Sequence, residues 1–245
     1  MTASDRPALD VAELRRAAVL PGGEWRSVDV IAETGSTNAD LLARAETGHD
    51  IRGAVLAAEF QSTGRGRQGR VWSAPARAQL AVSVGIDAQG VPSSAWGLLP
   101  LAAGVAVVEA VFDVTGIRVG VKWPNDVLAG DGSKLAGLLA EVSSRSAVIV
   151  MGIGLNVSLT EDELPGIGAT SLARLGAGEL DRTPLLIALL GRLGEQVSRW
   201  RRGDERLLEA YRRHSVTLAN ACGPSYRGSA ASPGWRRTST PRAGC

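Results

Sequence analysis

"KWPNDVLAGDGSKLAG", residues 122–137, is the stretch that most restricts the fold and chemistry of this chain. Pro124 keeps Trp123 out of helical geometry, so the segment predicts a turn at the end of a short strand. The turn exposes Asn125 and Asp126 side by side. A carboxamide beside a carboxylate suits a magnesium ion or the hydroxyl groups of a nucleotide. An ordinary hairpin turn would explain the turn alone, but not the lysines on both sides of it.

Those two lysines, Lys122 and Lys134, are the only lysines among the 27 basic residues of the chain. The arginine bias indicates a G+C-rich coding sequence, in which arginine replaces lysine wherever either cation serves. A compact ammonium group and a planar guanidinium group are not interchangeable. Both lysines are therefore candidates for a role that arginine cannot fill, although composition alone is equally consistent with chance.

Around this stretch, the hydrophobic periodicity predicts an α+β fold, a mixed sheet flanked by helices. One domain is expected over residues 1–218, followed by a different segment over 219–245. Strands are expected over 27–33, 54–60, 79–86, 117–123, 134–142 and 147–157, and helices over 10–20, from 36 or 37 onward, and over 93–112, 183–202 and 205–214.

Two further polar motifs follow predicted strands. "TGSTN" (34–38) places three hydrogen-bonding side chains where a strand passes into a helix, and a helix cap accounts for only one of them. "EFQSTGRGRQGR" (59–70) runs from Gln61 at a strand end into glycine-spaced arginines. Guanidinium groups on such a loop can bind a carboxylate or phosphate with two hydrogen bonds each. A solvated linker or an RNA-binding arm is the alternative.

A last motif, "GIGLNV" (152–157), is weak by itself, because glycines in a strand more often mark close packing than a ligand. It lacks the third glycine of a dinucleotide fingerprint. The chain also has no G-x-S-x-G elbow, no Walker loop and no metal-spaced Cys/His cluster. A site of Arg, Lys, Asp, Asn and Gln suits a reaction in which the substrate supplies the nucleophile, such as a carboxylate attacking the α-phosphate of ATP.

Charge and composition favour an enzyme in the cytoplasm over a nucleic-acid binder. The formal charge is +2, but residues 221–245 hold four arginines and no acid, so the preceding body is slightly acidic, unlike a nucleic-acid-binding domain. No signal peptide is expected, and no unbroken apolar run of the roughly 18–20 residues that span a membrane. The end of the chain contains no Val, Ile, Leu, Met or Phe after Asn220 and holds both cysteines, so it is expected to be disordered with free thiols.

The ordered set "GSTN", "EFQSTGRGRQGR", "KWPND", "KLAG" and "GIGLNV" resembles the biotin-protein ligase family over about residues 25–215. The resemblance implies a class II synthetase-like catalytic domain of the non-regulatory type, without the DNA-binding domain of repressor members. It implies formation of biotinyl-5′-AMP from biotin and ATP with Mg²⁺. Biotin then passes to one lysine of a biotin carboxyl carrier domain of a carboxylase. A monomer or weak homodimer is expected, with no DNA or membrane partner.

The resemblance also implies roles for individual residues. Positions matching biotin-binding residues are Ser36, Thr37, Asn38, Gln61, Arg65, Gly66, Arg67 and Lys134. Positions matching the ATP side are Lys122, Trp123, Asn125, Asp126 and Asn156. Among these, the implied catalytic residues are Lys134, Arg65, Arg67 and Asp126, with Asp126 as the implied magnesium ligand.

The end of the chain departs from the family pattern. Members continue into a small C-terminal β-barrel, which "SVTL" (215–218) is expected to begin before the pattern stops. We expect residues 219–245 to replace that barrel, and a frameshift would explain their composition. Alternatives to the biotin ligase are a lipoate or octanoate ligase of the same fold, a truncated member with impaired activity, and a nucleic-acid binder.

Overall fold

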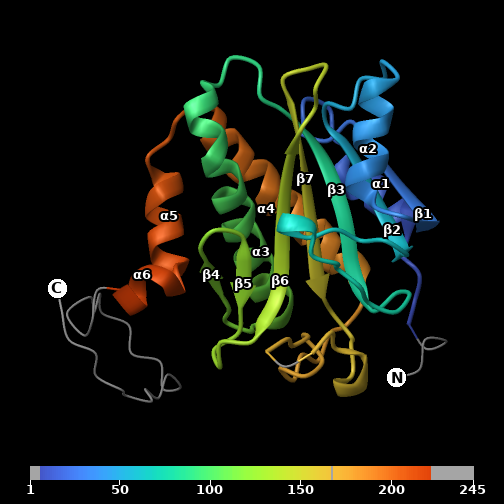
Figure 1. Cartoon of the computed structure of the whole chain (residues 1–245), viewed down its shortest axis with the longest axis vertical. Coiled ribbons are helices and arrows are strands. Elements are labelled where there is room, and N and C mark those ends of the chain that lie inside the picture. The colour runs from blue at the N-terminus through green and yellow to red at the C-terminus, as the bar shows by residue number, and fades with distance from the viewer. Residues whose placement is uncertain (1–5, 167, 222–245) are drawn as a thin grey trace.

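A computed structural model describes residues 6–166 and 168–221. Seven strands form one mixed sheet in the order β1-β2-β3-β7-β6-β5-β4 (Figure 1). β1 and β2 pair in parallel, and the other neighbouring pairs of described strands are antiparallel. The strands are β1 (Ser27–Thr34), β2 (Ala54–Gln61), β3 (Gln79–Asp87), β4 (Gly120–Lys122), β5 (Asp126–Leu128), β6 (Lys134–Val142) and β7 (Val148–Asn156).

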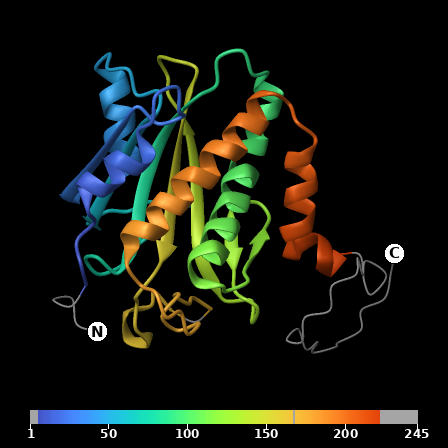
Figure 2. The same cartoon turned by 180° about the vertical axis from the view of Figure 1, so that it is seen from behind.

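Helices cover the two faces of the sheet unequally. α1 (Val11–Ala18), α3 (Leu99–Thr115) and α4 (Arg182–Arg201) lie over one face (Figure 2), whereas α2 (Thr37–Glu46) lies over part of the other. α5 (Arg206–His214) flanks α3 and is followed by α6 (Val216–Ala221). This arrangement confirms the predicted α+β class and leaves the face beside α2 open for a site.

α3 is apolar over most of its surface because it packs against the sheet and α4, while its two acidic residues, Glu109 and Asp113, pair with α5 and α4. Ten of its residues are buried, and Gly116 ends it in a left-handed conformation with φ of 71°. With the preceding 3₁₀ turn η3 (Ser93–Leu98), it makes a 23-residue helical stretch that contains an 18-residue window of mean hydropathy 1.8. By length and composition this stretch could cross a membrane, which corrects the expectation that no run is long enough. However, 56% of that window is buried inside the fold, as in a core helix.

At the β4 edge the structure contains one strand that was not expected and contradicts one prediction. The turn expected at Pro124 is present over residues 123–125, but it leads directly into a short strand that was not expected, β5, which pairs with both β4 and β6. "SVTL" was expected to begin a barrel strand, but helix α6 begins at Val216, and only Ser215 bridges to Val121 of β4. The helix fits because Gly120 has no side chain, and a Cβ there would collide with Val216. The expected disorder of the end of the chain, from residue 222 onward, lies outside the described residues.

The strand register brings the polar motifs together. Thr34 pairs with Gln61 across the parallel β1–β2 ladder, so "GSTN" leaves the sheet beside the glutamine at the end of β2. Gly137 of β6 pairs with Gly154 of β7, which joins "KLAG" to "GIGLNV". Motifs scattered over 120 residues therefore meet on the face that carries α2.

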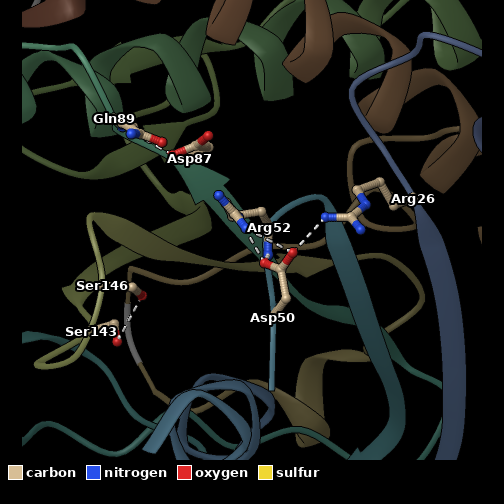
Figure 3. A network of polar contacts seen from close by, with 7 residues as sticks. All are labelled: Arg26, Asp50, Arg52, Asp87, Gln89, Ser143 and Ser146. Atoms are coloured by element: carbon tan, nitrogen blue, oxygen red, sulfur yellow. Dashed lines mark hydrogen bonds and ion pairs between the residues drawn. The ribbon is translucent and has the colours of Figure 1, made fainter. Parts of the chain in front are cut away.

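The opposite end of the sheet carries an exposed ion-pair network (Figure 3). Hydrogen bonds from the Arg52 and Arg26 side chains hold the pKa of Asp50 well below its usual range. Nearby, the Gln89 backbone donates to Asp87, and Ser146 donates to Ser143. The Asp50 ion pairs with Arg26 and Arg52 are exposed, so we expect them to contribute little to stability.

Candidate small-molecule site

A cavity of about 590 Å³ opens on the sheet face beside α2. It is lined by every residue predicted for the site except Asn156. A second cavity, of about 890 Å³, shares the arginine loop, Trp123 and Asn125 and continues along β6 to the start of α3. The two cavities give the site a deep pocket and an open approach.

The deep end of the pocket is built from short polar side chains that bond one another. The Gln61 Oε1 atom accepts from the backbone nitrogen of Thr37 at 2.9 Å and lies 3.0 Å from the Thr37 Oγ1 atom. Thr37 Oγ1 also lies 2.6 Å from Ser83 Oγ. Ser36 occupies the N-cap position of α2, but its side chain makes no capping bond, so the cap interpretation of this hydroxyl is wrong. All four residues are at least nine-tenths buried.

Asn38 continues this network across the sheet. Its Oδ1 accepts from Ser83 Oγ at 2.6 Å, and its Nδ2 donates to Glu141 Oε2 at 2.8 Å and to the Leu139 carbonyl at 3.3 Å. The amide lies over Gly152, where an added Cβ would collide with it. The first glycine of "GIGLNV" therefore makes room for the Asn38 side chain.

Trp72 uses the next glycines in the same way. An added Cβ would lie 2.5 Å from its indole at Gly154 and 3.1 Å from it at Gly137. The indole nitrogen donates to Gln79 Oε1 at 2.5 Å, which fixes the ring against the sheet. The Lys134 ammonium lies 5.4 Å from the ring centroid, close enough for a cation–π contact. Trp72 thus forms an apolar wall between the polar end and the cations.

The cations gather at the mouth of the pocket. Lys134 Nζ lies 2.6 Å from Asp126 Oδ1, and both side chains remain partly accessible. Arg67 donates to Asn125 Oδ1 at 3.3 Å, which links the arginine loop to the turn after β4. The Asn125 amide in turn donates to the Leu138 carbonyl at 2.8 Å. Lys122 also lines the pocket. This end therefore offers ammonium and guanidinium groups to an anion.

The arginine loop itself is a small hairpin. Arg65 bridges Val71, and Gly66 donates to the Arg70 carbonyl at 2.7 Å. Its tip is a 3₁₀ turn, η2 (Arg67–Gly69), in which Gln68 has a φ of 57°. The backbone is thus folded back on itself while its arginine side chains stay exposed at the mouth.

Asn156 lies outside the pocket lining. It is buried, and its amide donates to the Thr170 carbonyl at 2.9 Å. Thr170 in turn donates its backbone N–H to the Lys134 carbonyl, while Lys134 donates to the Gly168 carbonyl. In this arrangement Asn156 fixes the loop that supports the backbone of Lys134.

Sequence reasoning missed three residues of the pocket: Ser83, Trp72 and Glu141. Ser83 carried a signal, because it is the one polar residue inside the apolar run "LAVSVGI". Glu141 lies two and four positions after Leu139 and Gly137 in the same strand, so all three are on one face of the sheet. The face of Glu141 could therefore have been predicted from that of "KLAG". Trp72 had no local signal beyond its place after the arginines.

The fold and pocket together define a class: an α+β domain that binds a small molecule on one face of a mixed sheet. Residues 35–157 match the family model described as biotin/lipoate A/B protein ligase. The chain is 48% identical over 218 residues to the biotin–[acetyl-CoA-carboxylase] ligase of Mycobacterium tuberculosis, spanning 88% of this chain and 80% of that one. This chain therefore belongs to the biotin/lipoate A/B protein ligase family.

More distant comparisons agree with this membership. The bifunctional ligase/repressor BirA of Escherichia coli is 36% identical over 179 residues, and the match covers 71% of this chain but only 53% of BirA. The structure resembles the biotin protein ligase from Aquifex aeolicus in complex with biotin and ATP, with a TM-score of 0.67 and 27% identity over 78% of this chain and 79% of that one. The predicted resemblance to biotin-protein ligases is thus confirmed.

Proposed function

We propose that this chain is an ATP-dependent biotin ligase, which forms biotinyl-5′-AMP and transfers biotin to a lysine of a biotin carboxyl carrier domain. The observation that carries the proposal is the polarity of the pocket, with neutral hydrogen-bonding groups at the deep end and cations at the mouth. Biotin has the same two ends, a cyclic urea and a carboxylate. The relatives and the Aquifex complex support the same assignment.

In this proposal the deep end holds the urea ring. The side chains of Ser36, Thr37 and Gln61 face it, and Asn38 orders them through Ser83. Trp72 flanks the apolar part of the substrate. Buried polar groups that lose their ligand partner are costly, so a substrate without a urea ring binds less well.

The cationic mouth serves the reacting groups. A carboxylate oxygen of biotin attacks the α-phosphorus of ATP, and the bond to the pyrophosphate oxygen breaks. Lys134, Arg65 and Arg67 neutralise the repulsion between the carboxylate and the phosphates, and Gly66 lets the loop backbone approach them. In the second step the carrier amine attacks the acyl carbon, AMP leaves and the amine proton passes to solvent.

The nucleotide side is assigned to Lys122, Trp123, Asn125 and Asp126, with Asn156 supporting the loop behind Lys134. Among the described residues there is no group of three carboxylate, His or Cys side chains that could hold a metal ion. Mg²⁺ is commonly bound by one or two carboxylates together with substrate phosphates, so Asp126 fits an ion that arrives with ATP. When bound, the ion would neutralise phosphate charge.

The partner and setting follow from this chemistry. The acceptor is the lysine of a biotin carboxyl carrier domain, reached through the larger cavity beside β6. We place the reaction in the cytoplasm, where ATP is available, with the enzyme a monomer or weak homodimer and with neither DNA nor a membrane as partner. We assign the catalytic domain to residues 1–218.

Adenylate formation tests the proposal, because the family name covers both biotin and lipoate substrates. The purified chain is incubated with ATP and either biotin, lipoate or octanoate, and pyrophosphate release is measured. We expect release with biotin and little with the other two acids. A separate reaction with a carrier domain tests transfer. A folded protein that releases pyrophosphate only with lipoate or octanoate would reverse the substrate assignment, and no release with any acid would contradict the activity.

A further inference from the structure

Glu141 is the one charged side chain at the deep end of the pocket network that the proposed reaction does not use. It lies on β6, on the same side as Gly137 and Leu139, and its partly buried carboxylate lines the larger cavity. It forms no ion pair with a described residue. Its closest polar contact is the neutral amide of Asn38, 2.8 Å away.

This contact decides which way the Asn38 amide points. A carboxylate can only accept hydrogen bonds, so the amide must turn its Nδ2 toward Glu141. The Leu139 carbonyl reinforces this orientation, but at 3.3 Å and without charge it is the weaker partner. Asn38 Oδ1 is consequently fixed toward Ser83, from which it accepts at 2.6 Å.

The orientation passes along the network. Ser83 has one hydroxyl proton, and the bond to Asn38 uses it. At the 2.6 Å contact between the two hydroxyls, Thr37 must then be the donor, so its single proton points to Ser83 and not to Gln61 Oε1, 3.0 Å away. Thr37 Oγ1 is left with a free lone pair. The bond from the Thr37 backbone fixes which end of the Gln61 amide is the oxygen. The other end, Nε2, makes no bond to a described residue and can donate to a substrate.

We infer that Glu141 is a positioning residue that, through Asn38 and Ser83, makes Thr37 an acceptor for a substrate N–H. Together with the free amide donor of Gln61, this gives the deep end one acceptor and one donor, the pair that complements the N–H and C=O of a cyclic urea. The inference rests on the proposed function, since it explains how that pocket recognises a urea ring rather than an alkyl chain.

The first test compares Glu141→Leu and Glu141→Gln, with Glu46→Gln as the matched control. Glu46 accepts from Ser144 and pairs with Arg145, outside both cavities. Loss of one charge-assisted hydrogen bond should raise the Kd of biotin about tenfold in Glu141→Leu. In Glu141→Gln an amide oxygen can still accept from Asn38, so the affinity should stay within about twofold. The KM for ATP and the melting temperature should not change.

The second test reverses the contact. Asn38→Asp places two carboxylates face to face, so biotin affinity should fall about a hundredfold. Adding Glu141→Gln to this variant supplies an amide donor to the introduced carboxylate and should recover about tenfold, because the two sites are in direct contact. The introduced carboxylate would still accept from Ser83, so the orientation of the network would be kept.

The outcomes separate this inference from the proposed function. If the unaltered protein neither binds biotin nor releases pyrophosphate, the proposed function fails. If it does both and Glu141→Leu binds biotin as tightly as Glu46→Gln does, the positioning role alone is overturned. Equal losses of biotin affinity, ATP affinity and melting temperature in Glu141→Leu would also overturn it, because they would show a purely structural role.

Discussion

At the scale of single side chains, the deep end of the pocket is held in place by hydrogen bonds among its own polar groups, while Gln61 Nε2 stays free to donate. Among the described residues, the buried polar side-chain atoms without a partner belong to Arg6 and Gln196, both outside the pocket. Such preorganisation lowers the cost of orienting the site when substrate arrives. The assignments of individual residues to biotin and ATP stay predictions that substitution can test.

Lys134 is expected to be the most sensitive cation. Lys134→Ala should lower the rate of adenylate formation about 10²–10³-fold, the usual cost of removing one donor that stabilises developing charge. Lys134→Arg should not restore it, because a planar guanidinium group does not replace a compact ammonium. The measurement is pyrophosphate release at saturating biotin and ATP.

The control for that substitution is Arg52→Ala at the far end of the sheet (Figure 3). It should leave the rate unchanged. Melting temperatures of both variants should stay near that of the unaltered protein, since Lys134 is partly exposed and its ion pair with Asp126 contributes little to folding. An unchanged rate in Lys134→Ala would contradict its catalytic role.

Gly154 tests the packing of Trp72. A Cβ at this position would lie 2.5 Å from the indole, so Gly154→Ala should reduce the free energy of unfolding by about 1–3 kcal/mol. Gly178 is the matched control, because its Cβ would have no neighbour within 4 Å and Gly178→Ala should be nearly neutral. Urea unfolding measures both. Equal midpoints for the two variants would show that Trp72 moves aside freely.

At the scale of elements, α5 is joined to the core partly through a half-buried histidine. His214 ends the helix, 3.9 Å from Glu109 of α3. Burial lowers the pKa of His214, and this effect outweighs the opposing attraction of Glu109. The folded protein therefore favours the neutral ring.

The pH dependence follows from that direction. The unfolded chain binds a proton near pH 6.5, while the folded chain resists it to a lower pH. The stabilisation is fully present above pH 6.5 and is lost as the pH falls through the lowered folded pKa. Urea midpoints between pH 7.5 and pH 5 should thus decline more steeply in the unaltered protein than in His214→Gln. Parallel curves for the two proteins would contradict this prediction.

At the scale of the whole molecule, a buried ion pair joins three distant parts of the chain. Arg182, at the start of α4, donates to Glu59 of β2 at 2.6 Å and to the Pro7 carbonyl at 2.8 Å. Glu59 also accepts from the backbone nitrogen of Leu9 at 2.8 Å. Burial lowers the pKa of Arg182, and Glu59 offsets part of that cost.

Glu59→Gln should therefore destabilise the fold strongly. Removing one charge leaves the other buried without compensation, which costs about 3–5 kcal/mol. Glu195→Gln, which breaks an exposed pair with Arg192, should cost less than about 1 kcal/mol. Urea unfolding compares the two. A similar small loss in both would mean that the Arg182 charge finds solvent or another partner.

The sequence by itself determined most elements and the family. The strands predicted over 134–142 and 147–157 match β6 and β7 to within one residue at each end. Both were predictable because an apolar run bounded by turn residues indicates a buried strand. The polar motifs also predicted much of the cavity lining. They could do so because the residue types that bind anions and a polar ring can be recognised in the sequence. The α+β class and the resemblance to biotin-protein ligases are both confirmed.

Only the tertiary structure decided how those motifs work together. β5 forms because it pairs with β6, and α6 fits because Gly120 leaves room for Val216. Neither contact can be predicted from the local sequence. Ser83 and Glu141 enter the site through contacts with Asn38 that span 45 and 103 positions of sequence. The two glycines of "GIGLNV" leave room for the side chains of Asn38 and Trp72, which come from other parts of the chain. Strand register and α2 set these distances, and both depend on burial summed over the whole sheet, so no single segment of the sequence contains them.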